Sequence, residues 1–354
     1  MTGAASPVDW ERAEQVATLI ASRRPAPLGD VAGWDPPMEL IEQQIEDVTG
    51  LRSAAGTATA QLIDRPTWIH ANIESFRALL QPVFEKLEAK RPTGGTANAM
   101  NSVSRQIAGA QLGTLLGWMS TRVLGQYDLL VGRDGKGDGA VYLVAANLAT
   151  VEDKFGFDPT SFRTWVLVHE LTHRAQFTGV PWMRGYFTGM VDAAINAVDP
   201  DPQVILAALK DALHNRAEAR QQVRDSGVAG LIASPEQREV IARIGGLMSL
   251  LEGHGDVTMT RAAGELVPDA ERFARVLSER RRRGNPLSRL VLRLTGMEGK
   301  LNQYAAGERF IAAVEAVGGP RMIDICWESQ EQLPSLDEIR TPELWLQRVG
   351  ERVA

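Results

Sequence analysis

Uncharged residues fill most of the stretch from Asp158 to Gly179, and this pattern predicts a single helix placed in the core. Asp158 followed by Pro159 is typical of an N-cap with proline at the first helical position. Gly179 can end the helix, and Pro181 prevents it from continuing. The sequence therefore bounds this helix at both ends.

Helical periodicity extends through most of the chain, whereas strand patterning is confined to one short run. Helices are predicted at 10–20, between 38 and 90, up to about 124, at 204–223, from 234 through 252, at 290–317, and in two short terminal pieces. The run Ala140–Ala145 is rich in β-branched and aromatic residues and predicts a strand. No repeat or clear linker divides the chain. We therefore expect one mainly α-helical domain over residues 1–354 with a minor β element, comprising an N-terminal helical part, 1–135, and a second part, 136–354.

The predicted helix carries the sequence His169-Glu-Leu-Thr-His173. Residues advance by about 100° each around a helix, so both imidazoles project from one face and can reach one metal ion. Two buried histidines and a glutamate need polar partners, which a metal supplies. HExxH is the zincin signature, in which His169 and His173 hold Zn²⁺ and Glu170 takes a proton from the metal-bound water. Arg174 departs from the pattern, because zincins usually have an uncharged residue there.

A catalytic zinc needs a third protein ligand and an open fourth position. The metzincin continuation HExxHxxGxxH is absent, because Gln176 and Gly179 replace its glycine and third histidine. Glu252 is the best candidate, with Asp256 on the same helical face to accept the other ring N–H of a ligand histidine. This spacing is similar to the gluzincin arrangement. His254 and Asp256 are alternative ligands, although His254 would lie about 200° from Glu252 around a regular helix.

A donor to the developing oxyanion would complete a catalytic site. The sequence offers four candidates and does not choose among them: Tyr304, Tyr186, Arg184 and Arg309. Lys300, Tyr304 and Glu308 recur at four-residue spacing and so share one helical face.

Glycines at regular spacing predict close packing between helices. Gly109, Gly113 and Gly117 form such a face, and we expect it to cross the zinc helix. Gly253 and Gly255 are expected to let their backbone pass close to the same helix.

The chain resembles a family of zincin-like, zinc-dependent metalloproteases found mostly in actinobacteria, one branch of which is associated with coenzyme F420 biosynthesis. The resemblance covers nearly the whole chain, and departs from the family pattern at Gly255 and Thr260. It rests on the following segments: Asp64–Trp68, Asn72, Ser75–Leu79, Gly117–Asp128, His169–Phe177, Val180–Trp182, Leu251–Asp256, Lys300, Gln303–Tyr304, Gly307–Phe310, Trp327–Ser329 and Leu333–Pro334. It implies a mostly helical zincin-like fold and a metallohydrolase activity. In zincins a strand just before the metal helix pairs with extended substrate, so Ala140–Ala145 is a candidate substrate edge, with pairing only inside the fold as the alternative.

The composition of the chain limits the classes of partner that we expect. A net charge of −6 argues against nucleic acid as a main partner. Met1–Pro7 lacks the basic start and apolar core of a signal peptide, and no apolar run approaches the roughly 20 residues of a membrane span. We therefore expect a cytoplasmic protein without a membrane partner. The single cysteine, Cys326, is expected to pack as a small apolar residue.

These observations favour a zinc-dependent hydrolase that acts at a carbonyl centre, with a peptide bond as the first expected target. Hydrolysis of a small metabolite would use the same ligands in a more closed pocket. A non-catalytic zincin-like binding or scaffold protein is the third alternative, and a fourth protein ligand such as His254 or His214 would favour it. The sequence does not indicate the oligomeric state.

Overall fold

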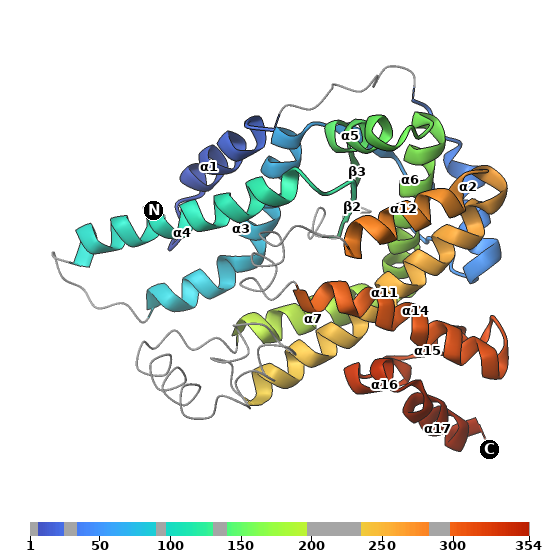
Figure 1. Cartoon of the computed structure of the whole chain (residues 1–354). Helices are drawn as coiled ribbons and strands as arrows, with labels where there is room; N and C mark the ends of the chain where they lie inside the picture. The colour runs from blue at the N-terminus through green and yellow to red at the C-terminus, as the bar shows by residue number, and fades with distance from the viewer. Residues whose placement is uncertain are drawn as a thin grey trace. The chain divides into compact units, whose positions relative to one another are not determined.

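The computed structural model describes residues 6–24, 34–89, 97–129, 140–196, 235–282 and 298–353. Over these residues the fold is mainly α-helical with one three-stranded sheet, as predicted (Figure 1). The chain divides into two compact units, one formed by Met1–Met38 with Thr57–Glu170 and the other by Glu39–Gly56 with Leu171–Ala354. The prediction of a single domain over the whole chain stays a prediction.

The first unit contains α1 (Trp10–Ser22), β1 (Ala60–Ile63), α3 (Arg65–Ala89), α4 (Ala97–Ser120), β2 (Gly125–Asp128), β3 (Ala140–Val144) and α5 (Ala145–Phe155). The second contains α2 (Met38–Thr49), α7 (Met183–Asn196), α11 (Pro235–Leu266), α12 (Ala270–Arg282), α14 (Glu298–Gly318), η1 (Met322–Asp324), α15 (Ile325–Glu328), η2 (Gln330–Gln332), α16 (Leu336–Arg340) and α17 (Pro342–Val353). Helix α6 (Pro159–Gly179) begins in the first unit and ends in the second. None of the helices described is long and apolar enough to cross a bilayer.

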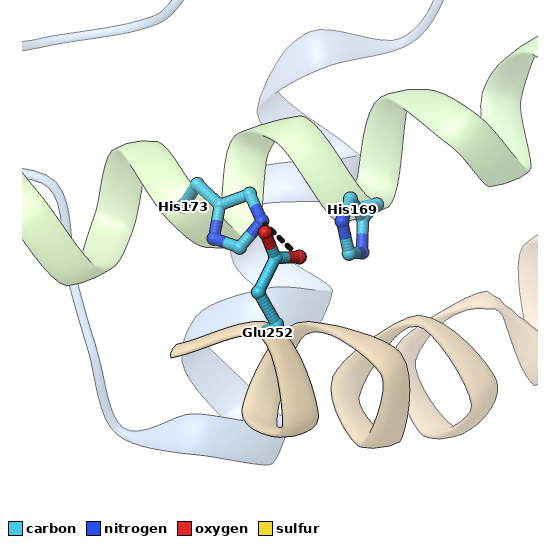
Figure 2. Close-up of side chains that lie close together, drawn as sticks. All are labelled: His169, His173 and Glu252. Carbon is cyan, nitrogen blue, oxygen red and sulfur yellow. Dashed lines mark ion pairs between the residues drawn. The ribbon is translucent and has the colours of Figure 1, made fainter. Parts of the chain in front are cut away.

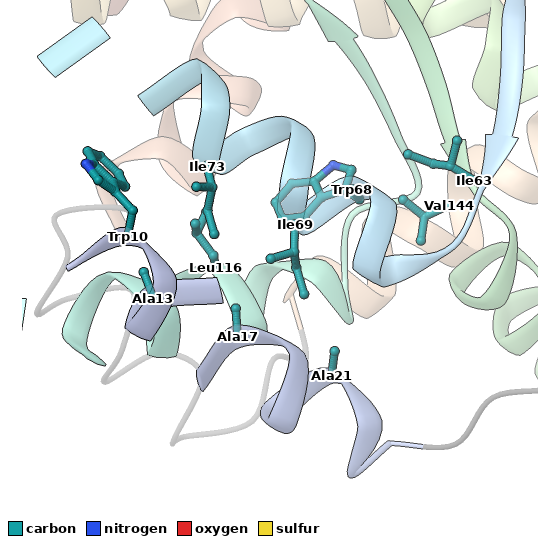
Figure 3. Close-up of a cluster of buried hydrophobic side chains, with 10 residues drawn as sticks. All are labelled: Trp10, Ala13, Ala17, Ala21, Ile63, Trp68, Ile69, Ile73, Leu116 and Val144. Carbon is teal, nitrogen blue, oxygen red and sulfur yellow. The ribbon is translucent and has the colours of Figure 1, made fainter. Parts of the chain in front are cut away.

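The glycine face of α4 packs against α1. The prediction that it crosses the zinc helix, the helix that carries His169 and His173, was wrong. A Cβ atom at Gly117 would lie 2.7 Å from the carbonyl oxygen of Ala17, and one at Gly113 would meet the backbone of Ala13. A Cβ atom at Gly109 would meet the backbone of Asp9, the N-cap of α1. Ala13 and Ala17 on α1 are fully buried, so both helices present small residues and can approach closely. This contact borders the hydrophobic cluster of the first unit, which is centred on Trp68, Ile69, Ile73 and Leu116 (Figure 3).

The predicted strand forms as β3, but it lies in the middle of the sheet. The order is β1-β3-β2, with β1 parallel and β2 antiparallel to β3. Both edges of β3 are therefore paired, and β3 cannot be the substrate edge. The strands of this sheet with an outer edge are β1 and β2.

Helix α6 begins and ends where the sequence predicted. The backbone N–H of Ser161 donates to Asp158 Oδ1 at 2.8 Å, and this hydrogen bond lowers the pKa of the Asp158 carboxyl. Gly179 ends the helix, and a Cβ there would lie 2.6 Å from the carbonyl oxygen of Arg52. Trp165 and Val168 on α6 are buried, which agrees with the expected core location.

Helix α11 runs without interruption through Gly253 and Gly255. A Cβ at Gly253 would lie 2.7 Å from the Cα of Gly307, so this glycine allows close approach of α14. The expectation that Gly253 faces the zinc helix was therefore wrong. Cys326 is buried, and burial raises the pKa of its thiol, which agrees with a packing role.

Candidate metal centre

Helix α6 carries His169 and His173 one turn apart, and α11 brings Glu252 to them (Figure 2). Each of the three side chains offers one ligand atom, and these atoms all lie within 4.8 Å of one another. The α6 helix itself sets the spacing of the two imidazoles, because they are four residues apart. Among the described residues these three form a group that could hold a metal ion.

The chemistry of the three donors fits a zinc ion, and so does the distance between His173 and Glu252. His173 Nε2 lies 3.5 Å from Glu252 Oε2. Zinc–ligand bonds of about 2.0–2.1 Å in a tetrahedral site put neighbouring ligand atoms roughly 3.3 Å apart. Two histidines with one glutamate are also a known donor set of catalytic zinc sites, which keep the fourth position for water or substrate.

Glu170 is buried and points toward strand β2. Its Oε2 atom accepts a hydrogen bond from the backbone N–H of Tyr127 at 2.8 Å. A Cβ atom at Gly125 would lie 2.7 Å from Glu170 Cγ and from Oε1, so the absence of a side chain at 125 makes room for the carboxylate. Nothing in the HExxH pattern signals this contact, because Gly125 and Glu170 are far apart in the chain.

The outer edge of β2 faces Glu170. The N–H of Val144 donates to the carbonyl oxygen of Leu124, and β2 pairs antiparallel with β3. In such a ladder the amides of alternate residues face the partner strand, so those of Gly125 and Tyr127 face outward. The candidate base therefore lies against the edge of a strand, although not of the strand that was predicted.

Side chains of α3 fix the position of β2. Asn72 and Gln126 exchange two amide hydrogen bonds of 3.2 and 3.3 Å. The Ser75 hydroxyl donates to the Asp128 carboxylate, with 3.2 Å between Ser75 Oγ and Oδ2. The segments of the sequence resemblance around Asn72 and Ser75 thus hold the strand that contacts Glu170.

Replacement of Gly125 by alanine is expected to displace the Glu170 carboxylate. Overpacking a well-packed position typically costs about 1–3 kcal/mol of unfolding free energy. Gly189→Ala is the matched control, because among the described residues no atom beyond its chain neighbours and its own helix backbone lies within 4 Å of the added Cβ. Alanine at this helical position should raise stability by up to about 1 kcal/mol. Urea unfolding of both variants checks the prediction, and equal stability of Gly125→Ala and the parent would contradict it.

Gln176 is a polar residue of the site that sequence reasoning missed. Its Oε1 lies 2.9 Å from His173 Nδ1. Its Nε2 donates to the carbonyl oxygen of Leu251 at 3.1 Å and lies 3.0 Å from His254 Nδ1. The signal that could have indicated it is the spacing, because Gln176 stands three residues after His173 and therefore next to it on the helix.

His254 lies outside the group of ligand atoms and is buried on a different face of α11. Its ring meets Trp327 edge-on, with 5.1 Å between the ring centroids. Burial lowers the pKa of His254 to about 3, with smaller contributions from His173 and Arg261, so the imidazole stays neutral near pH 7. The regular helix assumed in the sequence argument is present, and it keeps His254 away from the face of Glu252.

The roles predicted for the other site residues stay predictions. Asp256 is buried on α11, one turn after Glu252. Tyr186 on α7 packs against Trp182, with ring centroids 5.9 Å apart, and Arg184 on the same helix is half-buried. Arg309 on α14 is exposed. The side chain of Tyr304 and the whole of His214 lie outside the described residues.

Arg174, which departs from the usual zincin pattern, serves a packing role within the second unit. Its guanidinium is buried and donates to Glu42 Oε1 at 2.7 Å. It also donates to the carbonyl oxygens of Ala55 and Gly56, at 3.1 and 2.9 Å. The charge is therefore neutralised by a carboxylate and needs no exposure to water.

Comparison with known proteins agrees with this geometry. The sequence profile of the zincin-like metallopeptidases matches residues 8–346. The chain belongs to the zincin-like metallopeptidase family. It is also similar to a solved structure from Chloroflexus aurantiacus, described as "a putative hydrolase with a novel fold", with 32% sequence identity and a TM-score of 0.67. That match covers 97% of this chain and 99% of the other. No curated protein matches the chain.

Proposed function

We propose that this zincin-like protein is a zinc-dependent hydrolase that cleaves peptide bonds. The observation that carries the proposal is the grouping of two imidazoles and one carboxylate within 4.8 Å, beside a glutamate that follows the first histidine. Membership of the metallopeptidase family supports it. The placement in the branch associated with coenzyme F420 biosynthesis rests on the sequence resemblance alone and stays a prediction.

In this proposal His169, His173 and Glu252 hold the metal. A bound zinc ion lowers the pKa of a coordinated water to about 7 and polarises a carbonyl group. Glu170 accepts the proton of the attacking water and later donates it to the leaving amine. The N–H of Tyr127, which donates to Oε2, keeps the carboxylate oriented. Asp256 is proposed to accept the second ring N–H of a ligand histidine.

The outer edge of β2 favours a peptide over a small metabolite. An extended peptide can add to the edge of a sheet through main-chain hydrogen bonds. The outward-facing amide of Gly125 lies on the side of Glu170 in the first unit, next to the Tyr127 amide that donates to Glu170. A substrate strand on this edge would bring its backbone to the proposed base.

The test is hydrolysis of a peptide library by the zinc-loaded protein, with products read by mass spectrometry. Glu170→Gln is expected to lower the cleavage rate by at least about 100-fold, the usual contribution of general acid–base catalysis, with unchanged zinc content. Glu239→Gln is the matched control, because Glu239 is exposed on α11 and paired with Arg243. Cleavage by Glu170→Gln at the parental rate would refute the proposed role. Zinc binding without cleavage of any peptide would favour the small-metabolite or scaffold alternatives.

A further inference from the structure

The amide of Gln176 connects the zinc helix to the turn of α11 that carries Glu252. It makes three polar contacts, all inside the second unit: to His173 Nδ1, to the carbonyl oxygen of Leu251 and to His254 Nδ1. Gln176 itself is fully buried. A buried amide with all these partners has its orientation fixed by them, because an incorrect orientation would bring acceptors together.

The backbone carbonyl group of Leu251 decides the orientation of the Gln176 amide. A backbone carbonyl oxygen only accepts hydrogen bonds, so the atom 3.1 Å from Leu251 must be the amide nitrogen. The amide oxygen then faces His173 at 2.9 Å, and since an amide oxygen cannot donate, the proton lies on His173 Nδ1. In a neutral imidazole this leaves the lone pair on Nε2, which is the atom 3.5 Å from Glu252.

The second amide proton sets the tautomer of His254. The nitrogen of Gln176 lies 3.0 Å from His254 Nδ1 and can only donate there. His254 Nδ1 is therefore an acceptor, and its ring proton lies on Nε2. One amide thus assigns opposite tautomers to two histidines: His173 with the proton on Nδ1 and His254 with the proton on Nε2.

We propose that Gln176 is a positioning residue of the metal centre, which fixes His173 in the one neutral tautomer that can offer Nε2 to a metal. The hydrogen bond to the carbonyl oxygen of Leu251 orients the amide, so that its oxygen faces His173. The part of this inference that concerns zinc rests on the proposed function. The tautomer assignment does not, because it follows from hydrogen bonds of the protein alone.

Histidine nitrogen NMR of the metal-free protein tests the tautomers directly. The chain has five histidines, which can be assigned by single substitutions. In the parent protein we expect a protonated Nδ1 for His173 and a protonated Nε2 for His254. In Gln176→Leu, His173 should lose this preference and populate both tautomers. A proton on Nε2 of His173 in the parent would overturn the inference, whether or not the protein binds zinc.

The zinc affinities of two Gln176 variants distinguish a positioning role of this residue from a packing role. Gln176→Leu should lower the affinity about 10- to 100-fold, as is typical when the partner behind a ligand histidine is lost. Gln176→Glu keeps an acceptor for His173 but loses the donor to Leu251, so it should be less stable yet keep an affinity close to the parent's. A residue that only packs would give the opposite ranking. Gln176→Leu binding zinc as tightly as the parent would refute the proposal.

Thr178→Val is the control for loss of a polar group on the same helix. The Thr178 hydroxyl contacts Ser53 Oγ at 2.9 Å and the carbonyl oxygen of Arg174. This variant should keep the parental zinc affinity and the parental tautomers. If the parent binds no zinc, the proposed function fails, and the NMR result still decides the role of Gln176.

Discussion

Replacement of Glu252 by alanine is expected to lower zinc affinity by at least about 100-fold, since removal of a direct ligand should exceed the 10- to 100-fold cost of losing a group behind one. Glu252 Oε2 lies 3.5 Å from His173 Nε2 and provides the carboxylate of the donor group. Without it two imidazoles from one helix remain, and water must complete the coordination. Metal content by elemental mass spectrometry and competition with a chromophoric chelator measure the effect.

Glu239→Ala is the matched control for Glu252→Ala. Both residues lie on α11, but Glu239 is exposed and pairs with Arg243. The control should retain about one zinc per chain if three ligands hold one ion, as in other catalytic zinc sites. Full zinc retention in Glu252→Ala would show that another residue is the third ligand, and Asp256 would then be tested next. Absence of zinc from the reconstituted parent would favour the scaffold alternative.

Replacement of Arg174 by leucine is expected to lower the unfolding free energy by about 3–5 kcal/mol, the usual cost of breaking a buried ion pair from one side. The Arg174 side chain is 2% exposed and lies 2.7 Å from Glu42. Its loss would leave the partly buried Glu42 carboxylate and the carbonyl oxygens of Ala55 and Gly56 without this donor. Urea unfolding followed by circular dichroism measures the change.

Two further variants test why Arg174→Leu lowers the unfolding free energy. Arg243→Ala removes an exposed arginine that pairs with Glu239, and such surface pairs contribute about 0–1 kcal/mol. Glu42→Leu combined with Arg174→Leu removes both charges, so the double variant should be more stable than Arg174→Leu alone. A double variant that is less stable than Arg174→Leu would show that Glu42 stabilises the fold independently of Arg174.

Local features of the fold could be read from the sequence because their causes lie within a few residues. Asp158 and Gly179 bound α6, since capping and helix termination depend on neighbouring backbone groups. The same holds for the face shared by His169 and His173, which helical geometry alone sets. Glu252 was selected by spacing and resemblance, and the structure places it in the same donor group.

The glycines predicted where helices pack closely, but not which helix lies opposite each glycine. The glycines of α4 indicated a contact between helices, yet α1 and not the zinc helix provides the opposing small residues. Gly253 likewise meets Gly307 on α14. A glycine allows another backbone to approach closely, but it does not determine which backbone does so.

The sequence by itself determined the helical class, the limits of α6, and the chemistry and spacing of the HExxH residues, because these follow from local backbone and side-chain properties. Only the tertiary structure decided which strand has its outer edge beside Glu170, how Arg174 is neutralised, and that the Gln176 amide lies against His173. Each of these depends on groups that are distant in the chain or on the direction of a single hydrogen bond. Such contacts arise when elements pack, and packing depends on shape and polar satisfaction across the whole unit.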